Sequence, residues 1–170
     1  MKQNIYLIGF MGTGKSTVSR SLASLLGYEE IDTDEQISRQ QNQSITEIFE
    51  KQGEQVFREL ETALLVELAG AKHKIISCGG GMAMREENVA LMRKNGSVVL
   101  LTAEPGTILE RVKQDKGRPV LNGNMNLEYI GSLLAQRNPF YQAAGDLVVA
   151  TDGRSPDEIS KEIVKKMKNL

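Results

Sequence analysis

Short runs of apolar residues alternate along the chain with longer segments in which apolar and polar positions are interspersed. The apolar runs are continuous or rich in β-branched residues, and each is bounded by Gly, Asp or Thr. This pattern is typical of buried strands in a parallel sheet. The predicted strands are residues 4–8, 28–32, 75–78, 97–102 and 146–150.

The segments between these runs have the spacing of amphipathic helices. From Val56 to Leu68, within residues 53–69, an apolar residue recurs every four positions and predicts one buried stripe. The other helical patterns cover residues 15–26, 85–94, 105–114, 126–143 and 155–167. Together the elements predict an α/β fold, a three-layer sandwich with helices on both faces of a five-stranded parallel sheet. No repeat or linker divides residues 1–170, and we expect a single domain.

One segment has neither pattern. Residues 115–124, DKGRPVLNGN, combine Gly, Pro, Asn and charged residues with little periodicity. This composition is typical of a loop that runs over the surface between regular elements. We therefore expect a mobile surface loop at residues 115–124.

Composition and charge exclude some classes of function. Of the 170 residues, 40% are apolar and 25% are charged, which is ordinary for a soluble globular protein. The formal net charge of -1 gives no sign of a general surface for nucleic acid or membranes. The single cysteine, Cys78, cannot form an internal disulfide, and no apolar run reaches the roughly 18 residues of a transmembrane helix. The opening MKQNIYLIGF is unlike a secretory signal, so we expect a cytoplasmic protein.

The segment from Gly9 to Ser16, GFMGTGKS, satisfies the pattern G-x-x-x-x-G-K-[ST] between a predicted strand and a predicted helix. Its glycines allow successive backbone N–H groups to surround phosphate oxygens, and the following helix adds its positive end. Lys15 would supply a charge to the outer phosphates, and the Ser16 hydroxyl would hold Mg²⁺. The motifs of guanine specificity, Asn-Lys-x-Asp and Asp-x-x-Gly, do not occur in the sequence.

Two aspartates, Asp32 and Asp34, follow the second predicted strand. In an extended segment, residues two apart point to the same side, and at the carboxyl end of a strand that side faces the ligand crevice. One carboxylate could support Mg²⁺, and the other could accept the proton of a substrate hydroxyl. Alternatively, Asp34 is the N-cap of a helix that begins with DEQISRQ.

The segment CGGG, residues 78–81, follows the predicted strand KIIS. Three glycines allow the backbone to approach a ligand and to present N–H groups to it, although a purely structural turn is the alternative. Because no base is near Cys78 in the sequence, we interpret it as a small buried side chain and not as a nucleophile. The only histidine, His73, lies among lysines, and we expect it at the surface.

Together these segments resemble the shikimate kinase family, of the nucleoside-monophosphate-kinase-like group of P-loop proteins, over almost the whole chain. GFMGTGKSTVSRSLASLLG is similar to the P-loop and first helix of the family, and IDTD to its paired aspartates. SITEIFEKQGEQVFRELE resembles its substrate-helix signature, and CGGG its glycine turn. GRPVL resembles its lid, and RNPFYQAAG the segment that carries its second substrate arginine. Ser38 and Asn42 depart from the pattern, in which Glu and Gly are frequent, but Asn tolerates the left-handed backbone that Gly would serve.

The resemblance implies transfer of the ATP γ-phosphate to the 3-hydroxyl of shikimate, a step of aromatic amino-acid biosynthesis. It implies a monomer that uses ATP and Mg²⁺ and binds neither nucleic acid nor membrane. The residues implied to bind the ATP phosphates are Gly12, Thr13, Gly14, Lys15, Ser16 and Thr17, with Arg118 reaching them from the lid and Arg111 and Arg154 flanking the adenine. Those implied to act on the other ligands are Ser16 and Asp32 for Mg²⁺, Asp34 as candidate base at the hydroxyl, and Arg58, Arg137, Gly80 and Gly81 for shikimate. Lys15, Asp34 and Arg118 are the implied catalytic residues.

Three alternatives stay open at this point. A related small-molecule kinase, such as gluconate kinase, also acts on a carboxylate, although the FRELE and CGGG segments favour shikimate. A non-enzymatic P-loop protein would be expected to lack Asp34 or Arg118, and both are present. Glu61, three residues after Arg58 on the same helix face, could orient that arginine or form only a surface ion pair with it.

Overall fold

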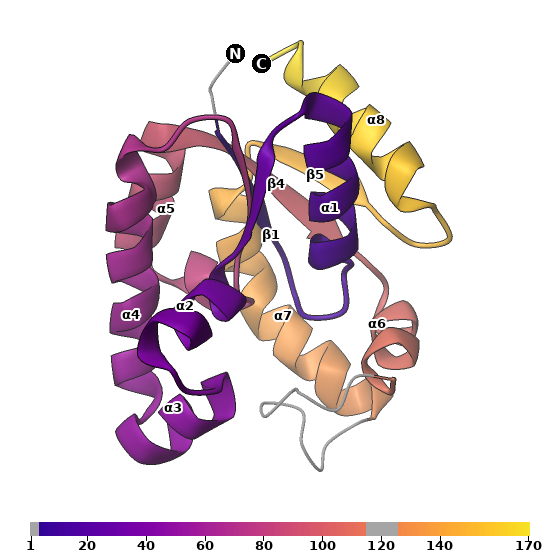
Figure 1. Ribbon diagram of the computed structural model, residues 1–170. Helices are drawn as coiled ribbons and strands as arrows, with labels where there is room; N and C mark the ends of the chain where they lie inside the picture. The colour runs from indigo at the N-terminus through magenta and orange to yellow at the C-terminus, as the bar shows by residue number, and fades with distance from the viewer. Residues whose placement is uncertain (1–3, 115–125) are drawn as a thin grey trace.

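Five parallel strands form one sheet in the order β2-β3-β1-β4-β5. The computed structural model, shown in Figure 1, describes residues 4–114 and 126–170. The strands are β1 (Asn4–Ile8), β2 (Glu29–Asp32), β3 (Lys74–Ser77), β4 (Gly96–Thr102) and β5 (Leu147–Ala150). The loop predicted at residues 115–124, with Arg118, lies outside the described residues.

Helices cover both faces of the sheet, which confirms the predicted three-layer α/β fold (Figure 1). The α-helices are α1 (Lys15–Leu26), α2 (Thr33–Gln41), α3 (Ile45–Gln52), α4 (Glu54–Glu67), α5 (Glu86–Asn95), α6 (Pro105–Val112), α7 (Leu127–Ala144) and α8 (Pro156–Met167). Two short 3₁₀ helices are η1 (Leu68–Gly70) and η2 (Met82–Met84). Helices α1 and α8 pack on one face, and α4, α5 and α7 pack on the other. Among the described residues, none of the helices has both the length and the apolar character needed to cross a membrane.

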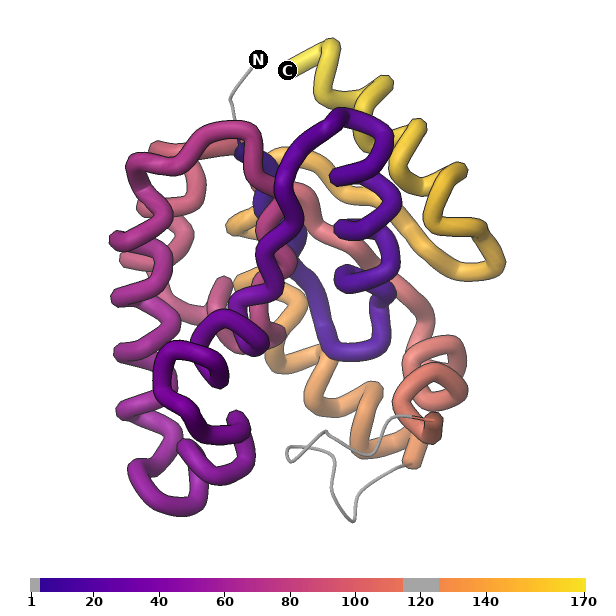
Figure 2. Tube along the Cα trace, in the orientation of Figure 1, coloured from indigo at the N-terminus to yellow at the C-terminus, as the bar shows by residue number. Residues whose placement is uncertain are grey.

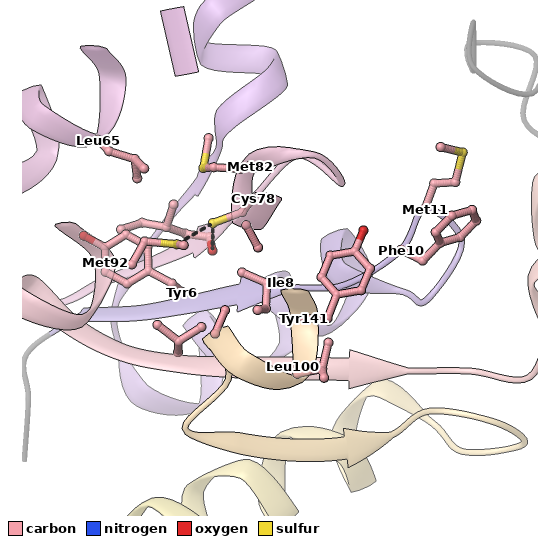
Figure 3. Packing of buried hydrophobic residues seen from close by; sticks show 14 of the residues in the cluster. Tyr6, Ile8, Phe10, Met11, Leu65, Cys78, Met82, Met92, Leu100 and Tyr141 are labelled. Atoms are coloured by element: carbon pink, nitrogen blue, oxygen red, sulfur yellow. Dashed lines mark hydrogen bonds between the residues drawn. The ribbon is translucent and has the colours of Figure 1, made fainter. Parts of the chain in front are cut away.

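The central strand β1 is buried on both faces, which explains its uninterrupted apolar sequence. Side chains alternate along a strand, so Ile5 and Leu7 join the cluster beneath α1 and α8. Tyr6 and Ile8 join the opposite cluster, where Figure 3 shows them together with Leu100 of β4. The sheet is therefore held by two separate apolar layers, and its strand ends are fixed relative to one another.

All five predicted strands and all six predicted helices are present, with ends within two residues of those predicted. The prediction that every strand is buried is wrong for β2 and β5, whose residues are mostly exposed or partly covered. These two strands lie at the edges of the sheet, where a neighbouring strand is present on one side alone.

Helices α2 and α3 were not among the predicted helical patterns, although a helix at DEQISRQ formed part of the alternative for Asp34. Helix α2 buries one large apolar residue, Ile37, so it has no periodic stripe for a pattern to reveal. Helix α3 is only eight residues long, but Ser44 caps it by accepting a hydrogen bond from the Glu47 N–H, a signal that the sequence does contain. Asn42 ends α2 with a φ of 52°, which confirms the left-handed backbone expected there.

The predictions for Cys78 and His73 are confirmed. Cys78 is buried between β3 and α5, with its Sγ 3.9 Å from Met92 Sδ (Figure 3), and burial raises the pKa of its thiol. A buried thiol of raised pKa is a poor nucleophile. His73 is exposed and packs its ring edge-on against Tyr28.

Substitutions at two glycines, Gly9 and Gly27, can show how closely the P-loop packs against the sheet. Gly9 and Gly27 both have positive φ, 147° and 68°, but only at Gly9 would a Cβ collide with the carbonyl oxygen of Leu101 on β4. At Gly27, no heavy atom of the described residues beyond the glycine and its two chain neighbours lies within 4 Å of that position. We expect Gly27→Ala to cost about 1 kcal/mol of unfolding free energy, from backbone strain alone. Gly9→Ala should lower the unfolding free energy, measured by urea denaturation, by at least twice that amount. Equal losses of unfolding free energy in the two variants would contradict the close contact of Gly9 with Leu101.

Candidate functional site

The carboxyl ends of the central strands open into a pocket that joins three of the predicted motifs. Its volume is about 200 Å³, and its lining residues are Gly12, Gly14, Lys15, Ser16, Thr17, Asp32, Asp34, Ser77, Cys78, Gly79, Gly80, Arg111 and Val112. Figure 2 shows the turn between β1 and α1 at this end of the sheet, with α2 and α3 on one side and α6 on the other. The fold therefore brings the P-loop, the two aspartates and the glycine turn to one place.

The P-loop presents backbone N–H groups to this pocket. Gly14 precedes α1 with a φ of 92°, and among the described residues no side chain caps this end of the helix. Uncapped N–H groups and the positive end of the helix dipole favour an anion, above all a phosphate. The Lys15 ammonium lies over the same loop, where Nζ donates to the carbonyl oxygens of Gly9 at 2.8 Å and Phe10 at 3.0 Å.

The carbonyl groups of the P-loop accept hydrogen bonds from two residues that are distant in the sequence. The Thr151 hydroxyl donates to the Thr13 carbonyl oxygen at 2.8 Å, and Arg111 Nη1 donates to that of Gly12 at 3.0 Å. Because the C=O and N–H of a trans peptide point to opposite sides, the first bond turns the Gly14 N–H away from Thr151. Thr151 is buried and was not predicted, since no local motif marks a residue that meets the P-loop across 138 positions.

Asp32 lies where a metal ligand was predicted. Its Oδ2 accepts a hydrogen bond from the Ser16 hydroxyl at 3.2 Å, so two hard oxygen ligands lie together at the start of α1. No group of three or more His, Cys, Asp or Glu side chains suited to a metal occurs in the part of the chain that the structure describes. One carboxylate and one hydroxyl fit Mg²⁺, which retains waters and phosphate oxygens as its other ligands.

The alternative of Asp34 as a helix cap is wrong. Asp32 caps α2, because its Oδ1 accepts a hydrogen bond from the Glu35 N–H at 3.1 Å. Helix α2 begins at Thr33, so Asp34 lies in its first turn and not in the extended segment that was expected. Both aspartates nevertheless line the pocket, as predicted, because the chain turns into the helix at its rim.

Arg58, on α4, is held in a network of carboxylates beside the glycine turn. Its Nη1 donates to Glu61 Oε1 at 2.7 Å and its Nη2 to Glu54 Oε1 at 3.1 Å. Its guanidinium lies so close to Gly81 that a Cβ there would overlap it. Glu61 is fully buried, so the alternative of a surface ion pair is wrong, and Glu61 orients Arg58.

Arg137, on α7, approaches the same turn from the opposite helix. Its guanidinium lies next to Gly80 and 5.6 Å from the centre of the Phe10 ring. Gly80 and Gly81 are consecutive, so the fold brings Arg58 and Arg137 to adjacent residues although they are far apart in the sequence. Two guanidinium groups beside the backbone of a glycine turn form a suitable binding place for a carboxylate.

Arg154 lies elsewhere, at the end of the edge strand β5. Its Nη1 donates to the Ala150 carbonyl oxygen at 3.0 Å, and its Nη2 forms an ion pair of 2.5 Å with Glu162 on α8. Arg154 is not among the residues that line the pocket, whereas Arg111 is.

The buried Glu61 carboxyl predicts a pH-dependent stability. Burial raises its pKa from 4.5 to about 7, against the opposing effect of Arg58. The folded protein therefore binds this proton more tightly than the unfolded chain does, and the resulting stabilisation is complete below about pH 4.5 and is lost as the pH rises through about 7.

We therefore expect the stability difference between wild type and Glu61→Gln, which cannot ionise, to fall by about 2 kcal/mol between pH 5 and pH 8. Urea denaturation at pH 5, 6.5 and 8 measures the difference. Glu59→Gln, an exposed change on the same helix, is the control and should give a constant difference. A constant difference for Glu61→Gln as well would show that the buried carboxyl keeps an ordinary pKa.

Comparison with known proteins places the chain in a family. A family model described as shikimate kinase matches residues 11–168. The shikimate kinase of Thermodesulfovibrio yellowstonii is 39% identical over 168 residues, which are 99% of this chain and 96% of that protein. The solved structure of shikimate kinase from Acinetobacter baumannii in complex with shikimate superposes with a TM-score of 0.94 at 35% identity, over 99% of this chain and 94% of that one.

A gluconokinase from Sinorhizobium meliloti is similar in fold alone. The superposition covers 99% of this chain and 93% of the gluconokinase chain, with a TM-score of 0.63 but only 18% identity. The matches in sequence, by contrast, run over almost the whole chain and carry one family name. This chain belongs to the shikimate kinase family.

Proposed function

We propose that the protein transfers the γ-phosphoryl group of ATP to the 3-hydroxyl of shikimate, giving ADP and shikimate 3-phosphate, a step of aromatic amino-acid biosynthesis. The observation that carries this proposal is the position of Arg58 and Arg137 beside Gly80 and Gly81, adjoining a pocket with a P-loop. An acceptor carboxylate held there would be anchored next to the phosphate-binding loop.

The P-loop is the proposed site for the ATP phosphates. The N–H groups from Gly12 to Thr17 would bind phosphate oxygens, and Lys15 would offset the charge that spreads over the transferring group. We assign Mg²⁺ to Ser16 and Asp32, whose oxygens adjoin. When bound, the ion neutralises charge on the β- and γ-phosphates. Arg111 and Arg154 are the proposed neighbours of the adenine, and Arg118, outside the described residues, is proposed to reach the phosphates.

Asp34 is the proposed acceptor of the proton from the 3-hydroxyl. Its Oδ1 lies against Gly79, in the pocket that also holds Lys15. A carboxylate here can orient the hydroxyl for in-line attack and remove its proton as the new P–O bond forms. We further propose a single-domain monomer in the cytoplasm that acts without nucleic acid or membrane, in accord with the family resemblance and the net charge of -1.

Release of ADP, measured with shikimate, gluconate, nucleoside monophosphates or the methyl ester of shikimate, tests the acceptor. We expect turnover with shikimate and little with the other acceptors. Arg58→Ala and Arg137→Ala should each lower kcat/KM for shikimate at least about 30-fold, because truncating one partner of a buried charge pair costs on the order of 2–5 kcal/mol. ATP affinity without acceptor should not change.

Two comparisons control this experiment. Arg39→Ala removes an exposed guanidinium whose ion pair is with Glu35 on α2, and it should leave all the rates close to wild type. The methyl ester should lose less activity than shikimate does in the Arg58 and Arg137 variants, since its carboxylate is masked. If ester and acid were phosphorylated equally well by the wild type, a carboxylate site at these arginines would be ruled out.

The role of Asp34 is tested by Asp34→Asn, which keeps the size of the side chain but removes its basicity. General-base catalysis is typically worth ~10²–10⁴ in rate, so we expect kcat to fall by about that factor. Circular dichroism and the urea midpoint should remain near those of the wild type. A kcat within a few-fold of the wild type would reduce Asp34 to a residue that only positions the acceptor.

A further inference from the structure

The glycine turn, Gly79–Gly81, is held by two buried hydroxyl groups from different helices. The Tyr141 hydroxyl of α7 donates to the Gly80 carbonyl oxygen at 2.5 Å. On the other side, the Gly79 N–H donates to the Thr33 hydroxyl, at the start of α2, at 3.0 Å. Both side chains are almost completely inaccessible to solvent. The turn is therefore fixed at two successive residues by groups that belong to neither β3 nor η2.

These bonds determine which way the peptide groups of the turn face. Because C=O and N–H point to opposite sides of a trans peptide, directing the Gly80 carbonyl at Tyr141 turns the Gly81 N–H away from α7. Glycine has the most backbone freedom of any residue, so without these bonds the peptide could rotate at little cost. The Tyr141 hydroxyl thus supports the orientation of an N–H group beside Arg58, which lies against Gly81.

Tyr141 also adjoins the second arginine of the site. It follows Arg137 by one helical turn on α7, so both side chains lie on one face of the helix. Arg137 lies against Gly80, whose carbonyl accepts the bond from Tyr141. In Figure 3 the Tyr141 ring lies between Leu100 and Phe10, and its hydroxyl points away from Leu100. Burial raises the pKa of Tyr141, so its hydroxyl keeps the proton that it donates.

We propose that Tyr141 is a positioning residue for the acceptor: its hydroxyl fixes the glycine turn against Arg137, so that the Gly81 N–H and both arginines meet the acceptor carboxylate together. This inference rests on the proposed function. Tyr141 acts through the backbone of Gly80 and requires no contact with the acceptor. Loss of its hydroxyl should therefore weaken acceptor binding and leave the nucleotide site, on the other wall of the pocket, unaffected.

Tyr141→Phe, which removes one oxygen and keeps the ring, tests the proposal. Tyr6→Phe is the matched control, because Tyr6 is equally buried in the same apolar cluster and belongs to β1. A buried carbonyl that loses its partner predicts an increase in KM for shikimate of about ten-fold in Tyr141→Phe. We expect kcat and the Kd for ATP without acceptor to stay within about three-fold of the wild type, and Tyr6→Phe to change none of these values.

Amide hydrogen exchange in the free protein provides a readout that needs no substrate. The Gly79 N–H bonds to Thr33 and the Met82 N–H to the Gly79 carbonyl, so both should exchange several-fold faster when the turn loosens. Faster exchange in Tyr141→Phe but not in Tyr6→Phe supports the proposal even if the wild type fails to phosphorylate shikimate, which would overturn only the proposed function. Unchanged exchange, or an unchanged KM in an active enzyme, would overturn the role of Tyr141.

Discussion

A glycine-rich loop can present its N–H groups to a ligand only if other residues hold its carbonyl groups. Glycine has no side chain with which to fix its own conformation, and each glycine loses more backbone freedom on folding than other residues do. In this protein the P-loop is held by Thr151 and Arg111, and the glycine turn by Tyr141 and Thr33. Each pair of bonds sets the direction of the backbone groups in its own loop, and the charged side chains of the site surround these groups.

The two arginines near the glycine turn lie in different electrostatic surroundings. Both guanidinium groups lie over an aromatic ring, Arg58 over Phe57 and Arg137 over Phe10. Arg58 is in addition held by the carboxylates of Glu54 and Glu61. A guanidinium that already has carboxylate partners is oriented but partly neutralised, while one without such partners keeps more of its charge for a ligand. Arg58 is thus suited mainly to orienting a bound ligand, and Arg137 mainly to attracting its negative charge. Because Glu61 is buried, water does not screen its interaction with Arg58 as it would screen that of an exposed carboxylate.

Sequence alone predicted the parts of the site that short-range patterns encode. The P-loop, the paired aspartates and the glycine turn are contiguous motifs at strand ends, and a parallel sheet brings such ends together. The sequence could not indicate the roles of Thr151 or Tyr141, because each acts on a loop 138 or 61 positions away. Tyr141 lies in the segment RNPFYQAAG, but that segment pointed to Arg137 and not to a bond with the glycine turn. The role of Glu61 stayed open for a related reason, since its burial arises from the packing of α4 against its neighbours. The sequence offered Asp34, and not Asp32, as the alternative cap of α2, because a shift of two residues hardly alters the local sequence signal.

The edge strand β5 has a consequence for how copies of the chain behave toward one another. An exposed strand edge is a template on which a strand from another molecule can add. Here Arg154 covers the Ala150 carbonyl and Lys166 the Val148 carbonyl at 3.0 Å, and Glu162 of α8 holds both cations. A second chain that paired along β5 would have to displace this ion network and leave its charges without partners. Helix α8, which helps to cover one face of the sheet, therefore also protects the β5 edge against pairing with a second chain.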